Sequence, residues 1–134
     1  MEKAVIHSYK ELFVWQKSMD LVELVYGMSA SFPNEERFGL TSQIRRAAVS
    51  IPSNIAEGRG RSSRKDFIQF IHIASGSANE LETQLEIARR LSFCHGESYT
   101  KAASLLADVR RMLAKMLSSL KRAPGQSQKL KPDS

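Results

Sequence analysis

Arginine and histidine provide the first candidates for chemistry in this sequence. Arg90 and His95 are separated by four residues. In metal-independent cleavage of RNA, a histidine can shuttle protons at the ribose hydroxyl while an arginine holds the phosphate. A histidine near the negative C-terminal end of a helix is also favourable without any catalytic role. The spacing is therefore compatible with a ribonuclease centred on Arg90 and His95, but a structural histidine at a helix end explains it more simply.

Other catalytic and metal-binding patterns are absent from the sequence. Di-iron bundles use Glu-x-x-His on facing helices, and none of His7, His72 and His95 follows a glutamate at this spacing. Cys94 is the only cysteine, which excludes an intrachain disulfide and a Cys-x-x-Cys metal site. No Gly-x-x-x-x-Gly-Lys phosphate loop occurs. The main prediction is accordingly a protein with no catalytic residues, no metal and no cofactor.

Basic residues form two groups, and these are the candidate binding residues. The chain has 20 Lys and Arg against 14 Asp and Glu, a formal net charge of +6. Arginine can bind phosphate through two parallel hydrogen bonds, and phosphate contacts hold nucleic acid without reading its sequence. The predicted nucleic-acid-binding residues are Arg59, Arg61, Arg64, Lys65, Lys121 and Arg122 in the first group, and Arg45 and Arg46 in the second, where Arg89 and Arg90 are expected to join them.

Each group also has a simpler interpretation. A surplus of positive charge can serve solubility alone. Arg45 and Arg46 could form surface ion pairs with Glu80, Glu82 or Glu86, and each such pair adds little to stability. Exposed aromatic residues that could stack on bases are not evident, which argues against recognition of single strands. A phosphate-binding surface and a merely solvated one both remain open.

Four amphipathic helices are predicted to position these residues. Apolar residues step by three or four along each segment, as on one face of a helix, and no segment alternates with the period of a strand. Ser8 with Glu11, and Ser63 with Asp66, are capping patterns at two helix starts. Gly96 is expected to end the third helix. The predicted helices span residues 9–31, 40–57, 63–94 and 97–122.

The short links between these helices favour an all-α fold, an antiparallel up-down four-helix bundle. The bundle is expected to occupy residues 1–123, and residues 124–134 to form a flexible basic tail because they contain few apolar residues. In an up-down arrangement the end of the second helix, the start of the third and the end of the fourth lie together. The first basic group would then share one end of the bundle, and the second group the other.

Pro52 lies within the second predicted helix and removes a backbone donor to the carbonyl of Ala48. Either the helix splits at Ile51, or it continues with a bend and another group satisfies that carbonyl. Ile51 and Ile55 keep the four-residue spacing across the proline, which favours the continuous helix. The neighbouring residues are small and permit a close approach of another helix, so Pro52 is expected to shape packing.

Two stretches carry a resemblance to a known family. The segment NEERFGLTSQIRRAAVSIPSNIAEGRGRSSRKDFIQFIHIASGSANELETQLEIA, with its specific SIPSNIAEG motif, resembles the four-helix-bundle family encoded in intervening sequences of bacterial 23S rRNA genes. The segment LFVWQKSMDLVELVY is similar to the first helix of that family, and the match extends roughly from Tyr9 to Leu120. The basic tail and the Cys94-His95 pair depart from the family pattern.

The resemblance implies an antiparallel four-helix bundle that assembles into a ring-like homopentamer. It also implies kinship with the accessory variability protein of diversity-generating retroelements, which is basic and binds nucleic acid and a reverse transcriptase. Apolar residues beyond those that a monomer core needs, such as Val14, Leu21, Ile68 and Ile87, would suit contacts between subunits.

The sequence thus predicts a non-enzymatic, oligomeric binding module that holds RNA, DNA or a nucleic-acid enzyme such as a reverse transcriptase at Arg- and Lys-rich bundle ends. The alternatives are a protein–protein scaffold that uses no nucleic acid and a metal-independent ribonuclease. The sequence contains neither a stretch of about 18 apolar residues nor the apolar core of a signal peptide. We therefore expect no membrane partner and a cytoplasmic location.

Overall fold

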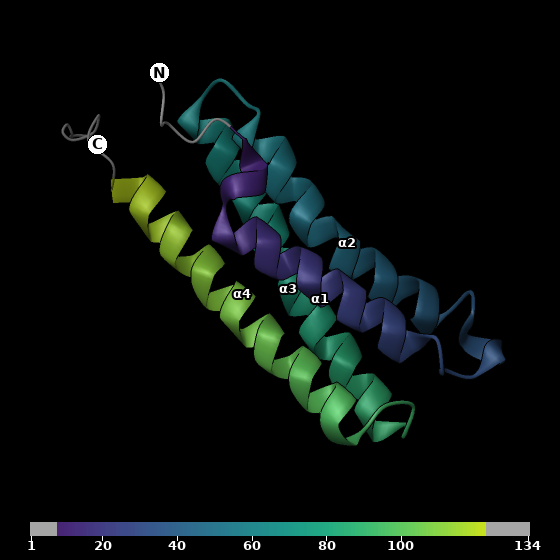
Figure 1. Cartoon of the computed structure of the whole chain (residues 1–134). Coiled ribbons are helices and arrows are strands. Elements are labelled where there is room, and N and C mark those ends of the chain that lie inside the picture. Colours follow the sequence, from purple (N-terminus) through teal and green to yellow (C-terminus); the bar gives the residue numbers. More distant parts are fainter. Residues whose placement is uncertain (1–7, 123–134) are drawn as a thin grey trace.

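Four α-helices lie alongside one another and form most of the structure, a computed structural model that describes residues 8–122 (Figure 1). Two short 3-10 helices, η1 (Tyr9–Glu11) and η2 (Asn34–Glu36), precede the first and second of them. The helices are α1 (Phe13–Ser29), α2 (Leu40–Arg59), α3 (Arg64–Arg90) and α4 (Gly96–Arg122), and residues 8–122 contain no strand. The predicted all-α class with four helices is confirmed. The tail predicted at 124–134 lies outside the described residues.

Each helix packs against two of the other three. Helix α1 contacts α2 and α4, and α3 likewise contacts α2 and α4. Within residues 8–122 the backbones of the diagonal pairs, α1 with α3 and α2 with α4, do not approach each other closely. The backbones of α2 and α3 run close together over the greatest length. This closed order of neighbours is consistent with a four-helix bundle around a single core.

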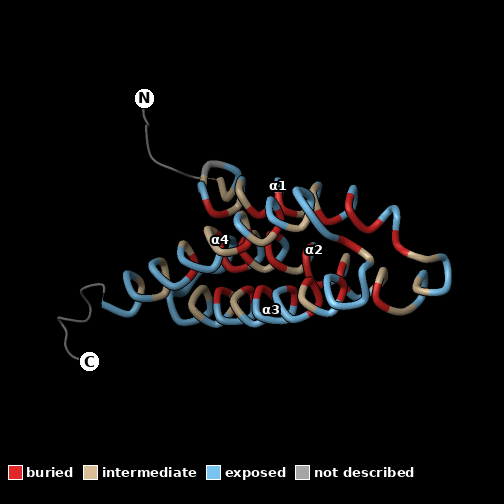
Figure 2. The backbone as a smooth tube through the Cα atoms, turned by 90° about the horizontal axis from the view of Figure 1, so that it is seen from below, coloured by how far each residue is buried: buried red, intermediate tan, exposed pale blue. Residues whose placement is uncertain are grey.

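An apolar core runs along the inside of the bundle. Figure 2 shows the buried positions recurring along one side of each helix. Full burial of an aliphatic side chain contributes roughly 1.5–3 kcal/mol relative to exposure, so these positions dominate the stability of the fold. The largest fully buried side chains are Leu21, Val25, Ile44, Ile51, Ile55, Ile71, Leu81, Leu85, Leu106, Val109 and Leu113.

Helix α2 continues through the buried Pro52, so the prediction of a continuous helix is confirmed. The polar residues around the proline join α2 to α3. The side-chain amide of Asn54 donates to the backbone carbonyl of Ser50 (2.8 Å) and to its Oγ (2.9 Å). The same Ser50 Oγ lies 2.8 Å from Oγ of Ser77 on α3. These hydrogen bonds lie where α2 packs against α3. A hydroxyl buried there without a hydrogen-bond partner would lower the stability of the fold.

The start of α1 differs from the prediction. Oγ of Ser8 accepts a hydrogen bond from the backbone N–H of Lys10 (3.1 Å), so this serine caps η1 and not the long helix. Leu12 then adopts an extended conformation, with φ −78° and ψ 129°, and α1 begins only at Phe13. The prediction of one helix from residue 9 was wrong because the capping pattern serves a separate 3-10 turn.

The end of α3 also differs from the prediction. The helix ends at Arg90 because Ser92 takes a positive φ of 63°. The N–H groups of Phe93 and Ser92 bond to the carbonyls of Ala88 (2.9 Å) and Arg89 (3.0 Å), which is a Schellman motif. Gly96, expected to end α3, is instead the first residue of α4. The cap expected at Ser63 is present, since its Oγ accepts from the N–H of Asp66 (3.1 Å).

Candidate nucleic-acid interface

A mostly apolar hollow marks one end of the bundle. Its volume is about 490 Å³, and its walls come from the start of α1, the end of α2, the start of α3 and the C-terminal half of α4. Because a single hollow touches all four segments, they lie together in space. The lining residues are Leu12, Phe13, Val14, Arg59, Phe67, Met112, Lys115, Met116, Ser119 and Leu120.

Arg59 is the member of the first predicted group that lines this hollow, and the other members lie in chain segments next to its lining residues. Two members of the group begin α3, two end α4, and the others lie at the end of α2 and in the link that follows it. All are exposed except Arg59, which is half-buried in the wall of the hollow. We call this group the cationic end; it consists of Arg59, Arg61, Arg64, Lys65, Lys121 and Arg122.

Close packing of α2 on α3 positions the basic link between them. A Cβ atom at Gly58 would lie 2.8 Å from Cβ of Phe70, so only glycine fits at this contact. The guanidinium of Arg61 lies 4.7 Å from the centroid of the Phe70 ring and forms an ion pair with Glu57 (2.8 Å). Stacking on an aromatic face leaves the edge of a guanidinium available for further hydrogen bonds. Arg61 is therefore held in a defined orientation at the surface.

Two acidic residues lie close in sequence to these cations. Glu57 is paired with Arg61, and Asp66 lies in the first turn of α3, where a carboxylate complements the positive end of the helix. The six cations of the cationic end exceed these two acids. The surface consequently carries an excess of positive charge, the condition for attracting a polyanion.

Lys115 is a further cation of this region that was not among the predicted binding residues. Lys115 lines the hollow together with Arg59 and precedes Arg122 by seven residues, two turns of α4. Cations at this spacing share one face of a helix. That periodicity was available in the sequence and could have added Lys115 to the group.

The second predicted group does not act as one cluster. Arg45 packs against the end of α1: its Nε donates to Oγ of Ser29 (2.8 Å), its Nη2 donates to the carbonyl of Tyr26 (3.3 Å), and its guanidinium lies 4.5 Å from the centroid of the Tyr26 ring. The alternative of an ion pair between Arg45 and a glutamate of α3 was therefore wrong. Arg46, the next residue, is exposed.

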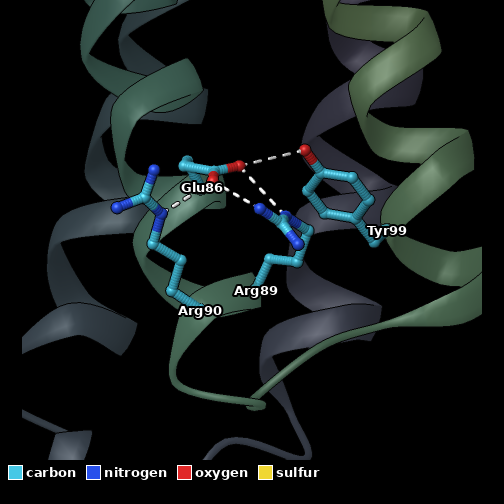
Figure 3. A network of polar contacts seen from close by, with 4 residues as sticks. All are labelled: Glu86, Arg89, Arg90 and Tyr99. Atoms are coloured by element: carbon cyan, nitrogen blue, oxygen red, sulfur yellow. Dashed lines mark hydrogen bonds and ion pairs between the residues drawn. The ribbon is translucent and has the colours of Figure 1, made fainter.

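Arg89 and Arg90 both bind the carboxylate of Glu86 (Figure 3). Nε and Nη2 of Arg89 lie 3.1 and 2.5 Å from its oxygens, and Nε of Arg90 lies 2.9 Å away. The hydroxyl of Tyr99 on α4 donates to the same carboxylate at 3.5 Å. Hydrogen bonds from Arg89 and Arg90 lower the pKa of Glu86 to about 2. Both arginines are thus paired with Glu86 at the surface of α3, and Tyr99 links this network to α4.

The possible ribonuclease pair is not assembled. His95 lines a hollow of about 510 Å³ between the end of α1 and the start of α4, together with Cys94 and Lys101. Arg90 lines a different hollow, formed with Glu82 and Tyr99. Burial raises the pKa of the Cys94 thiol, which opposes formation of a reactive thiolate. Arg90 and His95 thus line separate hollows, and Arg90 is ion-paired with Glu86.

Comparison with known families decides the family of the chain. A family model described as 23S rRNA-intervening sequence protein matches residues 10–115. The chain belongs to this family. A solved structure of a member of the S23 ribosomal protein family from Bacteroides thetaiotaomicron, a protein of unknown function, superimposes with a TM-score of 0.72 at 30% identity, covering 78% of this chain and 97% of that one. No curated protein matches the sequence.

The family match covers part of the cationic end. Arg59, Arg61, Arg64 and Lys65 lie within the matched residues of the 23S rRNA-intervening sequence protein model, and Lys121 and Arg122 lie beyond them. The α2–α3 link is thus a feature that this chain carries inside the family domain, and the last turn of α4 extends the positive surface further.

Metal binding and membrane insertion have no support in the described residues. Within residues 8–122 no cluster of three or more His, Cys, Asp or Glu side chains is suited to hold a metal ion. In the same part of the chain no helix combines the length and the apolar character that crossing a membrane requires.

Proposed function

We propose that this chain is a non-enzymatic binding module that holds nucleic acid, RNA or DNA, against its cationic end. The observation that supports the proposal is one hollow lined by both Arg59 of α2 and Lys115 of α4, because the basic residues at 61–65 and 121–122 follow these segments in the chain. Contacts from such a surface to phosphate oxygens are independent of sequence and weaken steeply with salt. The proposed location is the cytoplasm, where a nucleic-acid partner is accessible.

The proposal includes an antiparallel up-down topology and self-association into a ring of five copies. Close backbone approach between helices that are consecutive in sequence, and none between diagonal helices in residues 8–122, support the topology. Large apolar side chains left at the surface support self-association, and Phe13 (75% exposed) and Phe38 (89% exposed) are the most accessible of them. A ring would repeat the cationic end and convert several weak contacts into strong binding.

Electrophoretic mobility of a structured RNA hairpin tests the proposal. The test variant replaces three exposed cations, Lys65→Ala, Lys121→Ala and Arg122→Ala. Its affinity at low salt is expected to fall by roughly tenfold or more, because each lost phosphate contact weakens binding regardless of sequence. The proposal is contradicted if the wild-type protein does not retard the hairpin at low salt. It is also contradicted if the variant retards the hairpin as strongly as the wild type does.

A charge-matched variant controls for net charge. Lys101, Arg110 and Arg111 lie along α4 and pair with Glu97, Glu82 and Asp108 respectively. Replacement of all three by alanine removes the same formal charge from a region outside the cationic end, and we expect it to retain most of the RNA affinity. Capture of one stable protein partner by a chain that binds no nucleic acid would favour the scaffold function instead.

A further inference from the structure

We propose that the hollow at the cationic end receives Phe38 from a second copy of this chain. The inference rests on the self-association included in the proposed function, and it names the two surfaces that meet. One is the groove, defined as the ten residues that line the hollow beside α1 and α4. The other is the knob, defined as residues 34–38 in the link between α1 and α2.

The groove has the chemistry of a site for an aromatic ring. Seven of its ten lining residues are apolar, and Met112 and Met116 offer sulfur atoms, which make favourable contacts with aromatic rings. Phe13, in the same wall, is 75% exposed. The groove is therefore apolar surface that residues 8–122 leave uncovered, and two cations, Arg59 and Lys115, lie in its wall.

The knob presents the most exposed large apolar side chain of the described residues. Phe38 is 89% exposed, and its only ring contact within residues 8–122 is with Arg37, whose guanidinium lies 5.5 Å from the ring centroid. The chain here is held by local hydrogen bonds: Oε1 of Glu36 accepts from the N–H of Leu40 (3.0 Å), and its carbonyl accepts from the N–H of Gly39 (2.9 Å). A knob that is already ordered loses little entropy on binding.

Charge also fits the two surfaces to one another. The knob contains two acids, Glu35 and Glu36, and a single base, Arg37. The groove contains Arg59 and Lys115 and no acid. Insertion of Phe38 would bring the acids of one copy towards the cations of the next, and complementary charges of this kind fix the register of an interface.

The knob and the groove of one chain cannot meet each other. The knob immediately precedes α2, whereas Arg59 of the groove is the last residue of α2. A helix of 20 residues separates these points by about 30 Å. The contact is therefore between copies and uses two different surfaces, a heterologous contact that closes into a ring when the rotation between copies permits it.

Two complementary variants test this arrangement by sedimentation velocity. Phe38→Ala removes the knob, and Ser119→Trp fills the groove with a bulky side chain at an exposed position. Each variant alone is expected to lose self-association, with an increase in the dissociation constant of roughly tenfold or more. An equal mixture retains one intact knob and one intact groove, and should form a complex of two chains and nothing larger. Absence of that mixed complex would overturn the proposal.

A matched control and a charge exchange complete the test. Ile73→Ala truncates an apolar side chain of α3 that is 46% exposed and belongs to neither surface, so it should leave self-association unchanged. Glu35→Lys and Lys115→Glu should each weaken association, and the two changes in one chain should restore it.

Undiminished association of Phe38→Ala, or a wild-type protein that is monomeric, would overturn the knob-in-groove contact. Phe38→Ala keeps every cation of the cationic end, so RNA retardation that this variant retains at low salt reports on phosphate binding by a single copy, without the gain in affinity that a ring would add.

Discussion

Gly58 on α2 and Phe70 on α3 approach so closely that a methyl group on Gly58 would lie 2.8 Å from Cβ of Phe70. This contact sets the separation of the two helices at the end of the bundle where the basic link begins. The same phenylalanine ring carries the guanidinium of Arg61. Packing of the core and orientation of a candidate phosphate-binding residue therefore depend on one contact.

Gly58→Ala is expected to lower the free energy of unfolding by about 1–3 kcal/mol, because the added methyl group forces α2 away from α3. Gly76→Ala is the matched control. No atom lies within 4 Å of a Cβ built at Gly76, which is exposed within α3, so this change should raise stability by about 0.5–1 kcal/mol. Urea denaturation measures both variants. A Gly58→Ala variant as stable as Gly76→Ala would contradict the close-contact argument.

Arg45→Lys is expected to lower the free energy of unfolding by about 1 kcal/mol. Lysine keeps the positive charge but cannot reproduce both the stacking on Tyr26 and the hydrogen bonds to Ser29 and the Tyr26 carbonyl. Arg46→Lys, at the neighbouring exposed position, should change stability by less than about 0.5 kcal/mol. Thermal denaturation compares the two. Equal effects would show that Arg45 contributes only its charge.

Gln84→Leu is expected to raise the free energy of unfolding by about 1 kcal/mol. The side chain of Gln84 is 5% exposed, and its Oε1 is buried without a hydrogen-bond partner in the part of the chain that the structure describes. An apolar side chain of similar size removes that unsatisfied group. Gln69→Leu, at an exposed position of the same helix, should be nearly neutral. Destabilisation by Gln84→Leu would contradict the assignment.

The contribution of Glu86 to stability should depend on pH. Its pKa in the folded chain is about 2, against an ordinary value of 4.5, so the folded state favours the charged form. A group with a lowered folded pKa stabilises the protein above its unfolded pKa and loses that effect as the pH falls. The difference in melting temperature between wild type and Glu86→Gln should be constant above about pH 5 and shrink between pH 4.5 and 2. Glu80→Gln, at an exposed position of α3, should show no comparable change across that interval.

The sequence was sufficient to predict the number of helices and the continuity of α2. Apolar spacing reports directly on which face of a helix is buried, and Ile51 and Ile55 kept that spacing across Pro52. The positions of the helix ends were harder to predict from the sequence. The Ser8 pattern is compatible with either a 3-10 turn or an α-helix, and nothing local predicts that Ser92 adopts a positive φ. Such ends depend on tertiary contacts, here the packing of Phe93 on Phe32 with ring centroids 5.6 Å apart.

The candidate site was predictable to a similar extent. Charge density alone selected the basic residues of the α2–α3 link and the end of α4, and the expected up-down arrangement predicted that these segments lie at one end of the bundle. Charge could not reveal that Arg45 serves the end of α1, because its partners Tyr26 and Ser29 are uncharged. Nor could it reveal the groove, since an uncovered hollow arises from how four helix segments meet.

The salt dependence of RNA binding tests the central claim most directly. The logarithm of the association constant should fall linearly with the logarithm of salt concentration, and its slope counts the phosphates that the protein neutralises. For the variant lacking Lys65, Lys121 and Arg122 the slope should be shallower by about one unit for each cation that contacts a phosphate. The variant lacking Lys101, Arg110 and Arg111 should keep the wild-type slope. Identical slopes for all three proteins would contradict a phosphate-binding cationic end.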